Sequence, residues 1–160
     1  MAASSRSTAA PSAQPPIRRY RCSSVVVPTL PSRSAGRFGD GWLALWVSPR
    51  RYAEAVKRVH AAAAAAGRDG VAWQHALQLW TGLDRSRERA VARLRPVMER
   101  AYGLPFERFE RYCPCGRPAD IAEALQPYLD AGCRRFNFVC EAESLDAAIE
   151  GVAAIANLTT

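Results

Sequence analysis

A glycine-punctuated turn that leads directly into an apolar segment and a helix start constrains the fold of this chain most. The turn is Gly36-Arg37-Phe38-Gly39-Asp40-Gly41, and the apolar segment Trp42–Val47 follows it without a linker. Ser48 suits the N-cap of a helix, and Pro49 suits its first position, where the missing N–H of proline costs no hydrogen bond. We expect Asp40, which lies between two glycines, to fix the turn rather than to act as an acid or base. The pattern predicts a strand–helix unit of a parallel α/β fold.

Strand and helix patterns alternate along the rest of the chain. The range 71–81 predicts a second strand, and an arginine-rich helix follows with Asp84 as its expected cap. A helix is predicted over 118–131, a strand over 134–140 and a final helix over 144–155. From Gly36 onward the predicted order is β-α-β-α-α-β-α, which implies a parallel sheet covered by helices.

The first 35 residues differ from the rest in composition. They are rich in Ser, Ala, Pro and Arg and show no sustained period, so we expect a disordered tail with one strand candidate, Val25–Val27. They also hold five arginines and no acidic residue, so much of the formal charge of +7 lies there. The near-neutral remainder argues against a nucleic-acid-binding face. We therefore divide the chain into a tail, 1–35, and one α/β domain, 36–160.

The five cysteines lack a disulfide-like spacing, which is typical of a reducing cytosol, so we expect a cytoplasmic protein. We interpret Cys113 and Cys115 as incidental loop residues rather than a metal site. A closed zinc site needs four ligands, and His60 and His75 lie on other predicted elements. No stretch approaches the ~20 apolar residues of a membrane span. The sequence thus predicts no metal, nucleic-acid or membrane partner.

Three blocks of the sequence, taken in order, resemble the C-terminal third of the bacterial luciferase-like oxidoreductases, which depend on a flavin or on F420. The blocks are Gly36–Gly67, Leu104–Tyr112 and Gly116–Phe138. The resemblance implies a (β/α)8 TIM barrel of roughly 250 residues or more, so residues 36–160 would be its C-terminal βα units, a partial barrel. It also implies an FMN- or F420-dependent oxidoreductase or monooxygenase that acts on a small organic substrate.

As a fragment of such an enzyme, the chain is expected to be inactive as translated and able to self-associate through the open barrel edges. The alternative is a small, non-enzymatic α/β interaction or complementing module.

In the family, a strand ending in Gly-Gly-Arg-Ser precedes the turn, and its backbone approaches the cofactor phosphate. Here the segment Cys22–Val27 stands in that place. A shift of one nucleotide over the codons of Tyr20–Ser32, back-translated with GC-rich codons, can restore a strand and Gly-Gly-Arg-Ser at the expected distance. We therefore interpret residues 1–35 as an out-of-frame tail, with an ordinary disordered tail as the alternative. We expect this chain to bind the cofactor weakly. Glycines let the backbone approach the phosphate closely, so that its N–H groups can bind the anion, and this segment lacks those glycines.

Chemistry in a (β/α)8 barrel lies at the carboxyl ends of the strands. These ends make Trp46, Trp80 and Cys140 the candidate cofactor contacts. The two tryptophans could flank a flat isoalloxazine-type ring, and core packing is the alternative for both. No catalytic residue is predicted, because the cofactor of such enzymes supplies the redox chemistry. On the last strand Asn137 alternates with Phe138, and the sequence leaves open which face lines the barrel.

Overall fold

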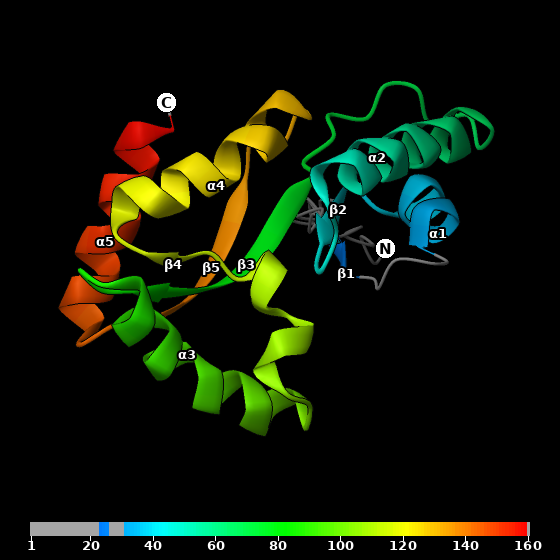
Figure 1. Ribbon diagram of the computed structural model, residues 1–160. Coiled ribbons are helices and arrows are strands. Elements are labelled where there is room, and N and C mark those ends of the chain that lie inside the picture. The colour runs from blue at the N-terminus through cyan, green and yellow to red at the C-terminus, as the bar shows by residue number, and fades with distance from the viewer. Residues whose placement is uncertain (1–22, 26–30, 160) are drawn as a thin grey trace, which may run out of the picture.

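The computed structural model describes residues 23–25 and 31–159 (Figure 1). In chain order its elements are β1 (Ser23–Val25), α1 (Pro31–Phe38), β2 (Gly41–Ala44), α2 (Pro49–Ala64), β3 (Ala76–Leu83), α3 (Arg87–Tyr102), two short 3-10 turns (Phe106–Arg108 and Glu110–Tyr112), β4 (Cys115–Gly116), α4 (Pro118–Asp130), β5 (Phe136–Glu141) and α5 (Leu145–Leu158). The predicted alternation of strands and helices is confirmed.

The boundary expected between residues 35 and 36 falls inside α1. Residues 31–35, which we expected to be disordered, are helical, and Ala35 is fully buried because α1 packs on α2. Residues 23–25 form a strand beside β2. The other tail residues, including Val26 and Val27 of the strand candidate, lie outside the described residues.

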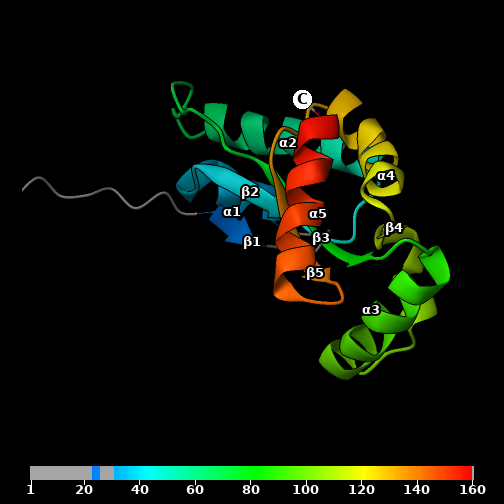
Figure 2. The same cartoon turned by 90° about the vertical axis from the view of Figure 1, so that its left-hand side faces the viewer.

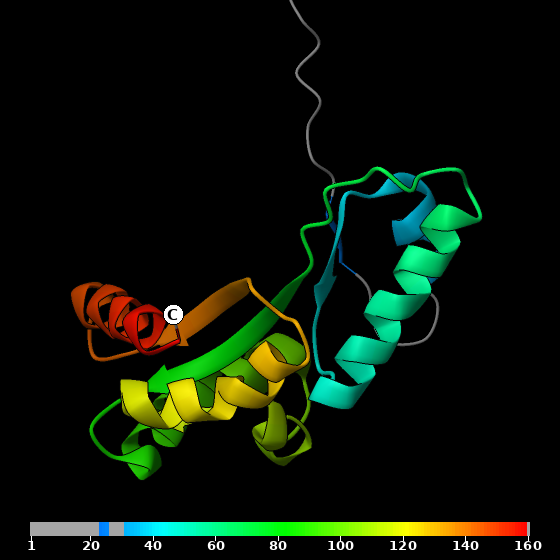
Figure 3. The same ribbon diagram turned by 90° about the horizontal axis from the view of Figure 1, so that it is seen from above.

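All strand pairs of the described residues are parallel, as the sequence predicts. β5 lies alongside β3 and covers one of its edges, from Leu77 opposite Phe136 to Gly82 opposite Glu141 (Figure 3). β2 and β4 pair with the beginning and the end of β3, and β1 continues the sheet beyond β2. Within the described part of the chain, β1 and β5 each have one strand partner. The sheet is therefore open at both edges and does not close into a barrel there.

Successive side chains of β3 point to opposite faces of the sheet, and a different core packs on each face. Leu77, Leu79 and Leu83 lie in the main core with residues of α2, α4 and α5. Figure 2 shows α5 in front of β3 and β5. Phe138 of β5 lies opposite Leu79 and packs on the same core, so Asn137 lies on the other face. In a closed barrel this second face is the interior, because helices cover the outside.

Helix α3 is the exception, because it packs on the second face, at the carboxyl end of β3. Gly82 there contacts the backbone of Ala90 so closely that a Cβ atom would have no room. A separate small core forms around this contact, and Figure 1 shows α4 above the strands and α3 below them. The buried members of this core are Ala90, Leu94, Met98, Phe106, Phe109, Cys113 and Cys115.

The segment Gly36–Gly41, predicted as a turn, is helical up to Phe38, because α1 extends into it, and only the residues after Phe38 turn into β2. Arg68 holds this segment. Its guanidinium donates to the carbonyl oxygens of Gly36 and Gly39, at 2.8 Å each, and pairs with Asp40 Oδ1 at 3.1 Å. Asp40 thus has the structural role that the sequence predicts. Ser48 caps α2 as expected, since its hydroxyl accepts from the N–H of Arg51 at 3.4 Å.

Several element bounds differ from the prediction, among them β5 and α5, which cover Phe136–Glu141 and Leu145–Leu158 rather than 134–140 and 144–155. β2 ends at Ala44 rather than Val47, and β3 covers Ala76–Leu83 rather than 71–81. α3 begins at Arg87, because Ser86 and not Asp84 caps it. Asp84 instead accepts from the N–H of Ser86 and pairs with Arg89 and Arg93. Among the described helices, none is long and apolar enough to cross a membrane.

Candidate functional site

Trp46 and Trp80 converge on one tyrosine. Trp46 lies just past the end of β2, whereas Trp80 lies inside β3, three residues before its last residue, Leu83, and not at the strand end that the sequence predicts. Trp80 lies in β3, and its Nε1–H donates to the hydroxyl of Tyr102, the last residue of α3, at 3.0 Å. Trp46 follows β2, and its ring centroid lies 5.5 Å from that of Tyr102 and 4.8 Å from that of Phe109. The structure therefore brings the two predicted tryptophans together through α3, which supplies a residue that the sequence analysis missed.

Trp46 has an unusual backbone conformation. Its φ is 55°, and no other non-glycine residue of the described ranges has a positive φ. Such a conformation costs a bulky residue on the order of 1–3 kcal/mol and persists only where surrounding contacts enforce it. The rings of Tyr102, Phe109 and Tyr112 surround Trp46 with centroid distances of 5.5, 4.8 and 6.2 Å. These contacts hold its indole at the strand end, and the same turn explains why β2 stops at Ala44.

Two amide side chains lie on the same sheet face as Trp80, deeper in the sheet. Asn137 Nδ2 donates to Gln78 Oε1 at 3.1 Å, across the β3–β5 pairing. In the part of the chain that the structure describes, Gln78 Nε2 and Asn137 Oδ1 have no protein partner. The face therefore offers a donor and an acceptor side by side. The alternation of Gln78 with Leu77 and Leu79 is the sequence signal that could have identified it.

Cys140 does not join the two tryptophans. It lies opposite Thr81 in the sheet and packs against the main core on the helix-covered face. Burial raises the pKa of its thiol to about 11, so the thiol is neutral at ordinary pH. The position of Cys140 at a strand end was predicted correctly, but the alternation of side chains turns it away from the other candidates.

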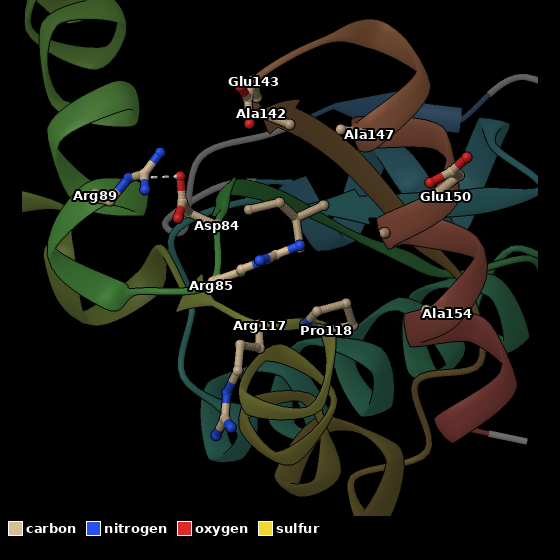
Figure 4. Close-up of a pocket in the computed structure, with 12 residues that line it drawn as sticks. Asp84, Arg85, Arg89, Arg117, Pro118, Ala142, Glu143, Ala147, Glu150 and Ala154 are labelled. Atoms are coloured by element: carbon tan, nitrogen blue, oxygen red, sulfur yellow. Dashed lines mark ion pairs between the residues drawn. The ribbon is translucent and has the colours of Figure 1, made fainter.

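A cavity of about 680 Å³ opens near the same strand ends, between the residues after β3, the start of α4, and α5 (Figure 4). Arg85 extends across it, whereas Arg117 points away and pairs with Asp120 at 2.8 Å. Glu143 and Glu150 also line it, so its charge is mixed. The cavity contains neither of the two tryptophans.

Trp46 and Trp80 are partly buried and pack against the small core around α3, as the core-packing alternative expects. Their rings and the amide of Gln78 are groups that can contact a flat heterocycle, and none of the three is a phosphate ligand of the kind that the resemblance implies. The phosphate cradle implied by the resemblance falls on the segment Cys22–Val27, of which the structure describes only Ser23–Val25, as β1.

Comparison with known proteins identifies the family and the fold. A family model described as luciferase-like monooxygenase matches residues 32–135. No curated protein matches the chain significantly.

Several solved structures share the fold. An F420-dependent secondary alcohol dehydrogenase, in complex with an F420–acetone adduct, superposes with a TM-score of 0.70 at 16% identity, covering 86% of this chain and 48% of its own. A coenzyme F420-dependent tetrahydromethanopterin reductase from Methanopyrus kandleri gives a TM-score of 0.55 at 17% identity, covering 76% of this chain and 45% of its own. A monooxygenase from Streptomyces bottropensis gives a TM-score of 0.55 at 16% identity, covering 86% of this chain and 46% of its own.

The chain spans about half the length of these proteins. At this identity the likeness shows the fold, a parallel α/β arrangement that corresponds to part of a luciferase-like TIM barrel. The family model covers more than half of the chain, from the first turn of α1 to the residue before β5. The chain belongs to the luciferase-like monooxygenase family.

Proposed function

We propose that the chain forms one part of the cofactor pocket of an oxidoreductase or monooxygenase that uses F420 or FMN and acts on a small organic substrate. The observation that carries this proposal is the convergence of Trp46 and Trp80 on Tyr102, in the carboxyl-terminal half of β3 and just past the end of the neighbouring parallel strand β2. Active sites of (β/α)8 barrels lie at the carboxyl ends of the strands. The family and the F420-dependent structural neighbours support the cofactor class.

Each side chain has a separate task in this proposal. The indoles of Trp46 and Trp80 form an apolar wall along a flat ring and exclude water from it. Tyr102 holds Trp80 in place by accepting its Nε1–H. Gln78 and Asn137 orient a heterocycle from their position deeper in the sheet. Gln78 Nε2 can donate a hydrogen bond to it, and Asn137 Oδ1 can accept one. The cofactor supplies the redox chemistry when bound. Cys140 has no contact with the ring in this arrangement, because it faces the helices.

The chain by itself should retain the cofactor poorly. Its described sheet is open at β1 and β5, so one side of the proposed pocket has no wall. Ser23, Ser24 and Val25 also stand where a glycine loop would approach a phosphate. We propose that residues 1–35 arise from a shifted reading frame and that the remaining strands are encoded upstream of Gly36.

Cofactor titration of two proteins tests the proposal. One is the chain as given, and the other joins residues 36–160 to the upstream, frame-corrected sequence of the same locus. We expect the longer protein to bind FMN or F420 stoichiometrically and the given chain to bind neither. The readout is the change in cofactor fluorescence. Stoichiometric binding by the given chain would contradict the partial-pocket proposal.

Matched tryptophan variants of the longer protein test the aromatic wall. Trp80→Leu should weaken cofactor binding at least tenfold. Trp73→Leu is the control, because Trp73 is also half-buried but lies before β3, at the opposite end of the strand. Equal affinities of the two variants would show that Trp80 does not contact the cofactor.

A non-enzymatic complementing module is the second candidate. The uncovered edges of β1 and β5 in the described residues favour it, because unpaired strand edges are templates for another chain. It predicts a stable complex with the upstream half, supplied as a separate polypeptide, in which neither FMN nor F420 binds. A complex that does bind cofactor would support the enzyme proposal instead.

A further inference from the structure

Two histidines lie together at the amino end of β3, whereas Trp46 and Trp80 lie towards the carboxyl ends of the strands. His60 lies on α2, and His75 directly precedes β3. Their Nε2 atoms are 3.0 Å apart, and their ring centroids are 5.2 Å apart. A contact this short between two ring nitrogens requires something between the two lone pairs. In the metal-free protein this is one proton, which one ring donates to the other.

The same separation fits two bonds to one metal ion. Histidine nitrogen bonds to such metals at about 2.0–2.1 Å. Two bonds of that length at a right angle place their nitrogens about 2.9 Å apart, whereas a tetrahedral angle places them about 3.4 Å apart. In the metal-free protein the shared proton sets the 3.0 Å separation, and a small turn of the rings would aim both nitrogens at one metal ion. Among divalent ions, affinity for such nitrogen sites rises through Ni²⁺ to Cu²⁺.

We propose that His60 and His75 form a two-histidine site for a divalent transition metal of the Cu²⁺ or Ni²⁺ type, which ties α2 to the start of β3. The site is independent of the proposed cofactor pocket. Within the described residues, no third His, Cys, Asp or Glu joins the pair. Water therefore completes the coordination, and the metal serves as a clamp between two elements.

The surroundings hold both rings in position. The ring of Trp73 stacks on both histidines. Its centroid lies 5.4 Å from that of His75 with an angle of 6° between the ring planes, and 5.5 Å from that of His60 with an angle of 28°. Arg68 lies over the other side of this group, 5.7 Å from the Trp73 ring, and Asp40 pairs with it. Rings held this way lose little freedom when a metal binds, which favours affinity.

The protonation state of His75 is also suitable. Burial, together with the neighbouring His60, lowers the pKa of His75 to about 4. Its ring is therefore neutral at pH 7, as a metal ligand must be. His75 Nδ1 is buried and has no hydrogen-bond partner in the described structure, so the stacked ring of Trp73, rather than a hydrogen bond at Nδ1, fixes the orientation of this ring.

The experiment is titration of the tag-free chain with NiCl2, because Cu²⁺ would also oxidise the free thiols. We expect one Ni²⁺ per chain, quenching of Trp73 fluorescence and a rise in Tm, since a ligand that binds only the folded state stabilises it. His75→Gln and His60→Ala should each lower the affinity at least tenfold and abolish the rise. His60 is exposed on α2, where alanine favours the helix, so the second variant should fold.

Trp73→Phe provides the matched spectroscopic control. It should bind Ni²⁺ but lose the quenched part of the fluorescence, because Trp73 is the indole that contacts both histidines. Unchanged Ni²⁺ affinity in both histidine variants would overturn the proposal and place the metal elsewhere. A chain that binds no Ni²⁺ at millimolar concentration would also overturn it and would show that the pair only shares a proton.

Discussion

Substitution of Gly82 by alanine should disrupt the packing of α3 on β3. A Cβ atom at Gly82 would overlap the carbonyl oxygen of Ala90 and lie 2.9 Å from its carbonyl carbon and 3.3 Å from its Cα. These are backbone atoms, so no rotation of a side chain can relieve the clash. Because α3 carries Tyr102, a displaced helix should also alter the hydrogen bond to Trp80.

The magnitude follows from two opposing effects. An extra methyl group in a tightly packed contact costs about 1–3 kcal/mol. Replacement of glycine by alanine returns about 0.4–1 kcal/mol, because the unfolded chain loses freedom. Because the clash is with backbone atoms, the upper part of the first range, about 2–3 kcal/mol, applies. Gly82→Ala should therefore lower the free energy of unfolding by about 1–2.6 kcal/mol. Gly70 is the matched control, since a Cβ there meets no atom within 4 Å and its φ suits alanine. Gly70→Ala should be neutral or slightly stabilising.

Urea unfolding at low protein concentration, followed by far-UV circular dichroism and tryptophan emission, measures both variants. We expect a lower midpoint for Gly82→Ala and a native emission spectrum that differs from that of the parent chain. Gly70→Ala should retain the parent spectrum. If the two variants unfold at the same urea concentration, α3 does not pack on β3 as described, and the position of Tyr102 beside the two tryptophans loses its support.

Four further outcomes are expected. Tyr102→Phe removes the acceptor of the Trp80 Nε1–H and should cost about 0.5–1.5 kcal/mol in urea unfolding; no change would mean that the bond does not form in solution. A hydrogen bond from Arg117 lowers the pKa of Asp120 from 3.8 to about 2, so the carboxylate stabilises the fold above about pH 4 and this contribution is lost as the pH falls towards 2. Circular dichroism between pH 2 and 6 should accordingly show a flatter acid limb for Asp120→Asn, and an unaltered limb would contradict this. Size-exclusion chromatography of the given chain should show self-association through the open strand edges, whereas a monodisperse, cooperatively melting monomer would count against it. Sequencing of the locus should reveal a barrel-like reading frame before the codon of Gly36, and its absence would refute the shifted-frame proposal.

Local patterns in the sequence were sufficient for the strand–helix order and the parallel sheet. Apolar periodicity reports which face of an element is buried, and Ser48 and Pro49 mark a helix start by their own chemistry. The blocks that resemble luciferase-like proteins lie within these elements, so the family could be predicted from the sequence as well. The ends of the elements were predicted less accurately. Trp46, for example, turns out of β2 because it packs against aromatic rings that are distant in the sequence.

The tertiary structure alone decided which side chains meet. Alternation shows that Asn137 and Phe138 face opposite ways, but only the helices packed on β5 show which way is outward. Tyr102 reaches Trp80, and His75 reaches His60, through contacts between elements that the chain connects by loops and helices. Such contacts depend on strand register and on the packing of whole helices. A local pattern in the sequence records neither, because it specifies the periodicity of one element at a time.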